Sequence, residues 1–438
     1  MRGALRAIAV VCLTAALVHA SRRALHAHAM LVGSEPPADS VVRTSPTRIR
    51  LIFSEEIEPS LASISIVPSD GRASRLRVSG DPHDVDAIIG DVAPLPPGAY
   101  RVMWHVVSAD GHPVGGTFVF WIGERSGVPA AESHTDVADG HSTWGPGVAQ
   151  APLVPVIVRG IAVGTAMAFA GLLLFASSYR RSVPMAGAEG LMRGLAVATP
   201  ILLALEFLTW VMNTAPDHHL TNTAVANAVA SGVGRVELWR LGLSVLALWA
   251  LWLVRRPRVA FVFAAAVVAV SGATGHSAAV SPLLATPARA LHLLAVAAWL
   301  GGLLWLLVCR RSAVTDLVRE AFRVSGVALW ASLMVALSGV AMTALFLASP
   351  RDLIDTAYGV VLLAKVAGLV ALLAFGAHHR FRALPRLAGD STTSARLDTT
   401  LRRELATMVV VVLLGGLLAF VPPRSARDSR PLPSSPIE

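Results

Sequence analysis

Long apolar runs separated by short arginine-containing loops constrain the fold of this chain more than any other feature. Each run is close to the ~20 residues that a helix needs to cross the hydrocarbon core of a bilayer. We count eight of them, at about 154–176, 193–213, 236–254, 259–275, 290–309, 324–347, 358–377 and 405–421. With only 15% charged residues, the chain lies well below the roughly one quarter that is usual in soluble domains. The sequence therefore predicts an all-α polytopic membrane bundle over 153–421, and it excludes disorder, a disulfide scaffold and an ordinary cytosolic enzyme.

The distribution of arginine predicts how the bundle is oriented. The chain has 37 basic and 28 acidic residues, and most of the basic residues that follow residue 153 lie in the loops after the first, third, fifth and seventh runs. Cytoplasmic loops carry an excess of Lys and Arg, so these loops are expected inside. The region before the first run and the tail at 422–438 are then extracytoplasmic, and the expected location is a bacterial cytoplasmic (inner) membrane.

The first 27 residues are typical of an export signal. Arg2 and Arg6 precede an apolar run at 7–18 that is too short to span comfortably. Cleavage is expected after Ala20 or after Ala27, and an uncleaved membrane anchor is the alternative. Cys12 and Cys309 lie far apart in different segments, so no disulfide framework is implied.

Residues 28–124 have a different pattern, in which apolar and polar residues alternate over short segments. The expected strands are 48–53, 61–67, 100–107 and 116–122, and turn signals such as Ala109-Asp110-Gly111 separate them. Alternation with a turn every ten residues or so favours an antiparallel, immunoglobulin-like β-sandwich. Residues 125–152, which contain Gly, Pro, Ser and His, are expected to be a linker.

Two stretches of the β region resemble the CopC family of periplasmic copper-binding proteins. They are His28–Pro37 (HAMLVGSEPP) and Trp104–Phe118 (WHVVSADGHPVGGTF). The resemblance implies a Cu(II) site in which the N-terminal histidine binds through its amine and its imidazole. An Asp and a His of an Asp-Gly-His turn complete that site. The corresponding residues here are His28, Asp110 and His112, and the amine ligand requires cleavage after Ala27.

Ligand chemistry supports assigning the copper ligands of the CopC family to these three residues, because Cu(II) favours tetragonal nitrogen and oxygen ligation. The alternative is that Asp110 and Gly111 only form a hairpin turn, with His112 as an exposed polar residue. His105 is interpreted as a core histidine rather than as a group supporting the ligands. Met30 and Met103 do not make a Met-rich Cu(I) site, so only Cu(II) is expected in the β domain.

The apolar runs resemble CopD, the membrane partner of CopC. The segments that carry the resemblance are Leu291–Gly302 (LHLLAVAAWLGG) and Tyr358–Lys365 (YGVVLLAK). A CopC domain followed by eight spans is similar to the fused CopC–CopD copper proteins, and this likeness covers nearly all of the mature chain.

Six charged or ionisable residues fall in the outer halves of the expected helices. Charges in hydrocarbon are costly and usually face the bundle interior or a wet cavity, so they predict a polar vestibule. Within it, Glu206 and Lys365 are the candidates for a charge pair. The six residues are Arg159, Glu206, Glu237, Arg240, His292 and Lys365.

Residues that can bind copper occur at both ends of the expected bundle. Imidazole and thioether groups suit copper, and thioethers favour Cu(I). Packing methionines and solvated histidines are the alternative interpretation, and His292 is the strongest single candidate. The outer group is Met212, His218, His219, His276, His292 and Met342, and the inner group is Cys309, His378 and His379.

The resemblances imply copper transport or resistance rather than an enzyme. We expect the β domain to capture Cu(II) and the bundle to move copper inward, with Cu(I) as the membrane species. Resistance by sequestration or efflux is the first alternative, and a copper or haem redox enzyme is the second. No nucleotide-binding loop is recognisable. The expected partners are the copper ion and the lipid bilayer, without nucleic acid, and the sequence does not identify a copper chaperone or reductase.

Overall fold

The computed structural model describes residues 29–69, 71–125, 153–178, 186–216, 218–275, 281–311, 317–386 and 391–421. These residues belong to two compact units. We call the described parts of 153–207 and 236–421 the helical unit. The described parts of 29–125 and 208–235 form the sandwich unit.

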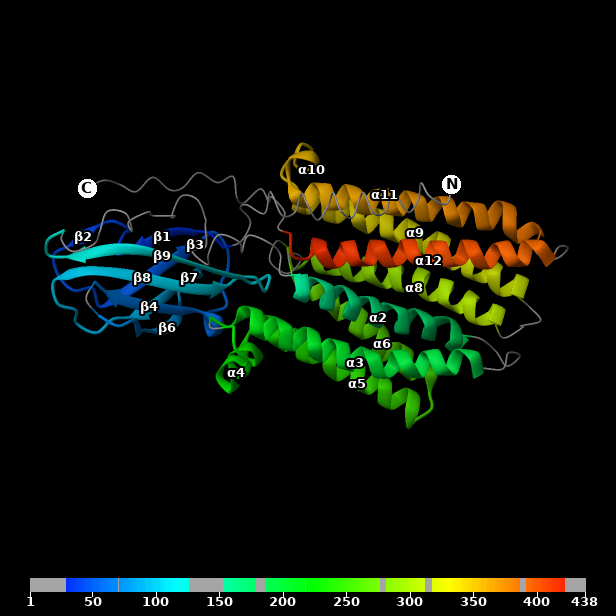
Figure 1. The fold of residues 1–438 in the computed structure, drawn as a ribbon, viewed down its shortest axis with the longest axis horizontal. Coiled ribbons are helices and arrows are strands. Elements are labelled where there is room, and N and C mark those ends of the chain that lie inside the picture. The colour runs from blue at the N-terminus through cyan, green and yellow to red at the C-terminus, as the bar shows by residue number, and fades with distance from the viewer. Residues whose placement is uncertain are drawn as a thin grey trace. The chain divides into compact units, whose positions relative to one another are not determined.

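The sandwich unit contains two β-sheets (Figure 1). The first has the strand order β1-β3-β7-β6 and is antiparallel throughout. The second has the order β2-β9-β8-β4-β5, with β2 and β9 parallel and the other neighbours antiparallel. The strands are β1 (Leu31–Glu35), β2 (Val41–Val42), β3 (Arg48–Phe53), β4 (Ser63–Pro68), β5 (Ser74–Arg75), β6 (Arg77–Asp81), β7 (Asp84–Asp91), β8 (Gly98–Val107) and β9 (Pro113–Ile122).

Inward-facing apolar residues of both sheets form one core. Val102, Val106 and Phe118 of the second sheet are buried with Ile49 and Leu51 of the first. Each expected strand is found, β3 with the expected bounds. Strands β1, β2, β5, β6 and β7 were not expected, because Gly, Asp and Arg residues interrupt the apolar alternation there.

Arg50 of β3 joins acidic residues on the first sheet. Its guanidinium lies 2.7 Å from Asp81 Oδ2 and 2.9 Å from Asp84 Oδ2. The pKa of Asp81 is lowered, first by a hydrogen bond from the backbone N–H of His83 and then by Arg50. This ion pair ties β3 to the β6–β7 hairpin at the surface.

Helices occupy each of the eight apolar runs. They are α2 (Leu153–Ser178), α3 (Ala186–Thr214), α5 (Gly232–Trp252), α6 (Pro257–Val270), α8 (Ala285–Arg311), α9 (Leu317–Phe346), α11 (Ala357–His378) and α12 (Ser391–Leu418). Shorter helical segments are η1 (Pro59–Leu61), α4 (Asn222–Ala230), η3 (Ser271–Ala273), α10 (Asp352–Asp355), η4 (His379–Ala383) and η5 (Leu384–Arg386).

Among the described residues, five helices are long and apolar enough to cross a membrane, namely α2, α3, α8, α9 and α11. The other three expected spans are weaker. Helix α6 has 14 residues, α5 includes Glu237 and Arg240, and α12 begins with a polar segment. The eight-span bundle therefore stays a prediction.

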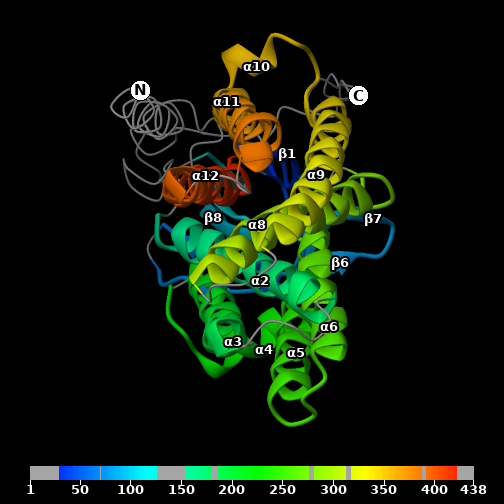
Figure 2. The same cartoon turned by 90° about the vertical axis from the view of Figure 1, so that its right-hand side faces the viewer.

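Helix α8 is the centre of the helical unit, where it packs against α2, α6, α9 and α12 (Figure 2). The contact with α2 is close because both helices have glycine there. A Cβ placed on Gly171 would lie 1.8 Å from the carbonyl oxygen of Ala297. Small residues that let helix backbones approach are typical of membrane helix packing.

Candidate metal-binding turn and intramembrane polar groups

The Asp110-Gly111-His112 sequence forms the tight turn between β8 and β9. Asp110 Oδ1 accepts hydrogen bonds from Ser108 Oγ and from the His112 N–H, the latter at 3.1 Å. His112 Nδ1 lies 2.9 Å from the same oxygen. Gly111 has φ +91°, a backbone conformation that residues other than glycine rarely adopt. The turn thus holds a nearly buried carboxylate directly against an imidazole.

The start of the described chain and this turn are hydrogen-bonded to the same short segment, residues 54–56. Ser54 and Met30 exchange two hydrogen bonds, from Met30 N to Ser54 Oγ at 3.0 Å and from Ser54 N to Met30 O at 2.9 Å. Two residues further on, Glu56 O accepts from Ala109 N at 3.0 Å. His28 lies outside the described residues, two positions before Met30. Met30, which follows His28 by two residues, is therefore hydrogen-bonded to the same segment as the turn.

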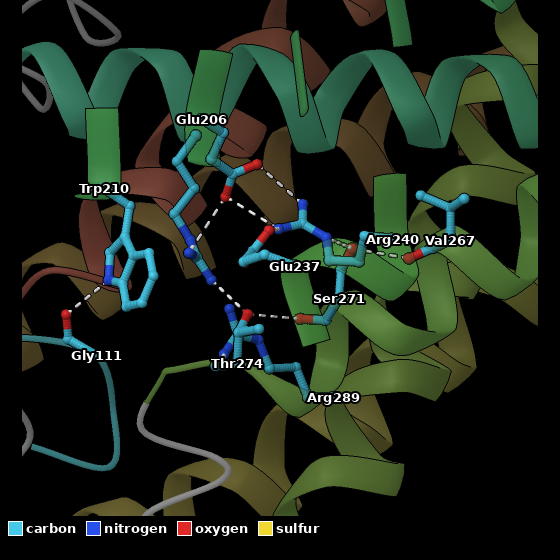
Figure 3. Close-up of polar contacts among 10 residues, drawn as sticks. Gly111, Glu206, Trp210, Glu237, Arg240, Val267, Ser271, Thr274 and Arg289 are labelled. Carbon is cyan, nitrogen blue, oxygen red and sulfur yellow. Dashed lines mark hydrogen bonds and ion pairs between the residues drawn. The ribbon is translucent and has the colours of Figure 1, made fainter. Parts of the chain in front are cut away.

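The end of α3 also contacts this turn within the sandwich unit. Trp210 Nε1 donates to the carbonyl oxygen of Gly111 at 3.0 Å (Figure 3). A second contact joins Gly232 N to Glu58 Oε1 at 2.7 Å. The backbone of the turn is therefore fixed from outside the β-sheets as well as from within them.

In the helical unit, Arg240 is at the centre of a buried charge cluster (Figure 3). Its side chain is 0% exposed. It donates to both carboxylate oxygens of Glu206, at 3.2 and 3.0 Å, and to Glu237 Oε2. Arg159 Nη1 lies 3.3 Å from Glu206 Oε1. We call Arg159, Glu206, Glu237 and Arg240 the arginine cluster.

Hydroxyl groups on the segment that ends α6 complete the arginine cluster. Ser271 Oγ accepts from Arg240 Nε at 3.0 Å, and Thr274 Oγ1 accepts from Arg159 Nη2 at 2.6 Å. Arg289 of α8 donates to the carbonyl oxygen of Thr274. Two carboxylates are thus bound by two guanidinium groups, with a third guanidinium next to them.

The expected charge pair between Glu206 and Lys365 is wrong. Glu206 is bound by Arg240 and Arg159. Lys365, on α11, has its ammonium group close to Gly415 of α12. The carboxylate is satisfied by guanidinium groups. A guanidinium is planar and can donate two parallel hydrogen bonds to the two oxygens of one carboxylate, a geometry that an ammonium group does not offer.

His292 is held against α9 by its ring nitrogen. Its Nδ1 lies 3.0 Å from Ser338 Oγ, and the Ser338 hydroxyl donates to the carbonyl oxygen of Met334 at 2.5 Å. This contact holds the imidazole of His292, on α8, against α9.

The other candidates of the outer group are divided between the two units. Met212, His218 and His219 belong to the sandwich unit, whereas His292 and Met342 belong to the helical unit. His218 Nδ1 contacts the carbonyl oxygen of Met212 at 3.3 Å, and Met212 is 43% exposed. His276 lies outside the described residues. Among the residues that are described, no three His, Cys, Asp or Glu side chains are placed to hold a metal ion.

The inner candidates have different surroundings. Cys309 is buried in the core of the helical unit, and His378 is exposed at the end of α11. His379, in contrast, is buried and pairs with an acidic residue of α12. Its Nδ1 lies 3.0 Å from Glu404 Oε2, and its Nε2 lies 2.9 Å from Thr400 Oγ1. We call His379 and Glu404 the histidine–glutamate pair.

Sequence reasoning missed Glu404 and the tryptophans that bind buried carboxylates. Trp299 Nε1 donates to Glu404 Oε1 at 3.1 Å, and Trp305 Nε1 donates to Glu320 Oε2 at 2.8 Å. Glu404 follows Arg402 and Arg403 at the border of an apolar run. Its position immediately before that run was the one available signal.

Comparisons with known proteins agree with this division of the chain. The family model of the CopC domain matches residues 31–123, and that of copper resistance protein D (CopD) matches residues 318–418. A similar curated protein is the copper transport protein CutJ of Bacillus subtilis (strain 168). It is 25% identical over 425 residues, which cover 90% of this chain and 74% of CutJ.

Two further relatives match the N-terminal region. Protein YobA of Escherichia coli (strain K12) is 36% identical over 114 residues, covering 26% of this chain and 90% of YobA. The crystal structure of CopC from Methylosinus trichosporium OB3b is 31% identical. It covers 23% of this chain and 100% of that one, with a TM-score of 0.21. With both domains in one polypeptide, the chain belongs to the CopC–CopD family of copper transport and resistance proteins.

Proposed function

We propose that the sandwich unit captures Cu(II) outside the cytoplasmic membrane and that the helical unit moves copper inward through it. The observation that carries the capture step is the contact between Asp110 and His112. The turn that contains them and Met30, near the start of the described residues, are hydrogen-bonded to the same segment, residues 54–56. If the signal is cleaved after Ala27, the amine and imidazole of His28 add two nitrogen ligands. The resulting nitrogen and oxygen set is the one that Cu(II) favours.

Within this proposal the two residues of the turn have distinct roles. The contact with Asp110 orients the imidazole of His112, in the way that a carboxylate orients a metal-binding histidine. The ring then presents Nε2 to the metal, and the Asp110 carboxylate supplies negative charge beside it. Trp210 and Gly111 keep the turn in this conformation.

In the helical unit, copper would pass as Cu(I) after a one-electron reductant outside the protein has reduced the captured Cu(II), since thioether and imidazole ligands suit Cu(I). His292 is the first membrane ligand that we propose, because its imidazole lies within the helical unit and is held against α9 through Ser338. The names of the CutJ and CopD relatives refer to copper transport and copper resistance. Inward movement is the direction in which a capture domain on the outer side is useful.

Cellular copper measured by elemental analysis tests this function. The strains are wild type, a deletion, and His28→Ala and His112→Ala variants, grown at limiting and at excess copper. We expect the deletion to contain less copper at limiting supply and both variants to be partly deficient. His83→Ala, which changes an exposed histidine of the same unit, should behave as wild type.

Three results would contradict the proposal. More copper in the deletion strain at excess supply would mean resistance by efflux or sequestration instead of uptake. Equal copper in all strains under both conditions would argue against transport altogether. If His83→Ala lowers copper as much as His112→Ala does, the proposed capture site is wrong.

A further inference from the structure

Ser108 directly follows β8 and comes two residues before Asp110. The residue is 0% exposed, and Asp110 itself is 5% exposed. The Ser108 hydroxyl donates a hydrogen bond to Asp110 Oδ1. A fully buried hydroxyl is therefore directed at the carboxylate of one of the three residues that we expect to bind Cu(II).

The backbone of Ser108 closes the turn without the hydroxyl. Its N–H donates to the carbonyl oxygen of His112 at 3.0 Å, and its carbonyl oxygen accepts from Gly111 N at 2.8 Å. Ile57 and Ser108 also form an isolated antiparallel bridge. Alanine at position 108 would keep these contacts, because the backbone makes them. The hydroxyl is therefore not required to form the turn, and its effect falls on the carboxylate of Asp110.

The hydroxyl has one hydrogen and two acceptors within reach. Besides Asp110 Oδ1, the carbonyl oxygen of His112 lies 3.3 Å from Ser108 Oγ. A carboxylate is the stronger acceptor of the two, because a hydrogen bond to an ionised group is roughly twice as strong as one between neutral groups. The principal partner of the hydroxyl is therefore Asp110.

Two donors thus fix one oxygen of the Asp110 carboxylate. Oδ1 accepts from Ser108 Oγ and from His112 N, the latter at 3.1 Å. The bond from His112 N is the local one that Asp side chains commonly make to the backbone two residues on. The bond from Ser108 adds a second direction, so the carboxylate cannot rotate without breaking a hydrogen bond. His112 Nδ1 lies 2.9 Å from the same oxygen, so the imidazole also packs against a fixed group.

Groups that hold metal ligands in place influence metal affinity. A carboxylate that is already fixed in one orientation loses less freedom when a metal binds to it. Residues that hydrogen-bond to metal ligands are typically worth roughly 10- to 100-fold in metal affinity. Ser108 lies in the position of such a residue relative to Asp110.

We propose that Ser108 is a positioning residue of the Cu(II) site, which acts through the carboxylate of Asp110 and so on the neighbouring His112. This inference rests on the proposed capture of Cu(II), and it adds a residue to which the resemblance assigns no role. The hydroxyl stays bound to Asp110 while the metal binds, and it is not itself a copper ligand.

Titration of Cu(II) into the purified protein tests this role. Affinity is measured by competition with a chelator of known affinity, and the metal site is followed by electron paramagnetic resonance. Ser108→Ala should bind Cu(II) roughly 10- to 100-fold more weakly than wild type, with a changed copper spectrum. The matched control is Ser79→Ala, which removes an exposed hydroxyl from β6. It should keep the affinity and the spectrum of wild type.

A double-mutant cycle shows whether Ser108 acts through Asp110. Effects of independent residues add, whereas those of residues that act through one another do not. In an Asp110→Ala background, Ser108→Ala should therefore change the Cu(II) affinity by less than about 2-fold. A merely structural role of the hydroxyl would lower the affinity by the same factor in both backgrounds.

The outcomes separate the two proposals. If wild type binds no Cu(II), the proposed capture fails and the role of Ser108 fails with it. If Ser108→Ala binds Cu(II) as tightly as wild type, or if its loss is equal in the Asp110→Ala background, the positioning role is wrong while capture stands. Should Ser108→Ala not fold, Ser108→Thr keeps the hydroxyl and should bind Cu(II) as wild type does. Weaker binding by this variant overturns the inference.

Discussion

Two of the buried carboxylate sites that the structure describes in the helical unit differ in the base that lies against the carboxylate. In the arginine cluster, Glu206 and Glu237 bind Arg240, whose guanidinium remains protonated at any pH that the protein meets. In the histidine–glutamate pair, Glu404 faces the imidazole of His379 at 3.0 Å. Burial is similar at both sites. The two sites therefore differ in the partner of the carboxylate, which is a guanidinium in one and an imidazole in the other.

The largest effect is expected from Arg240→Met. This change removes the guanidinium that binds both carboxylates, so Glu237 loses its partner and Glu206 keeps only Arg159. Loss of one partner of a buried ion pair costs about 3–5 kcal/mol. Thermal unfolding in detergent should show a large decrease. Arg193→Met, which removes an exposed arginine paired with Glu189, should change little. Equal losses in both variants would show that burial does not set the strength of the cluster.

A smaller effect is expected from Trp299→Phe. The substitution keeps most of the packing but leaves Glu404 Oε1 without its donor, and an unsatisfied buried acceptor costs about 1–3 kcal/mol. Trp305→Phe is the matched variant, because Arg323 also lies near the carboxylate of Glu320. Stability measured by thermal unfolding should fall less in Trp305→Phe. A larger loss in Trp305→Phe would contradict the view that Glu404 depends on Trp299.

The smallest effect is expected at the surface ion pair of the sandwich unit. The pKa of folded Asp81 lies below its ordinary value, so the stability it contributes is present above that value and is lost as pH falls through the lowered pKa. Wild type should therefore be slightly more stable than Asp81→Asn at pH 7, and the difference should vanish in strong acid. Unfolding followed by tryptophan fluorescence measures it.

Asp91→Asn, at an exposed carboxylate, is the control for that series. It should show no comparable dependence on pH. A difference between wild type and Asp81→Asn that grows as the pH is lowered would contradict the sign of the prediction. It would also weaken the contrast between this partly buried pair and the fully buried ones, because solvent is expected to screen a pair that it reaches.

The sequence predicted those parts of the fold that local patterns specify. Apolar alternation identified β3, β4, β8 and β9, whereas the polar β6 and β7 were missed because their pairing depends on the sheet they join. The resemblance to CopC identified the Asp110–His112 turn, and the structure places the two side chains in contact. The binding of copper there stays a prediction, since His28 lies outside the described residues.

The sequence by itself determined the division into an alternating β region and a series of apolar helices, together with the polar residues in those helices. Only the tertiary structure decided which of them pair. Spacing along one helix shows which residues share a face. The partner across a bundle depends on how helices far apart in sequence are packed and rotated. That packing places Arg240 rather than Lys365 against Glu206, and it gives Glu404 a histidine in place of an arginine.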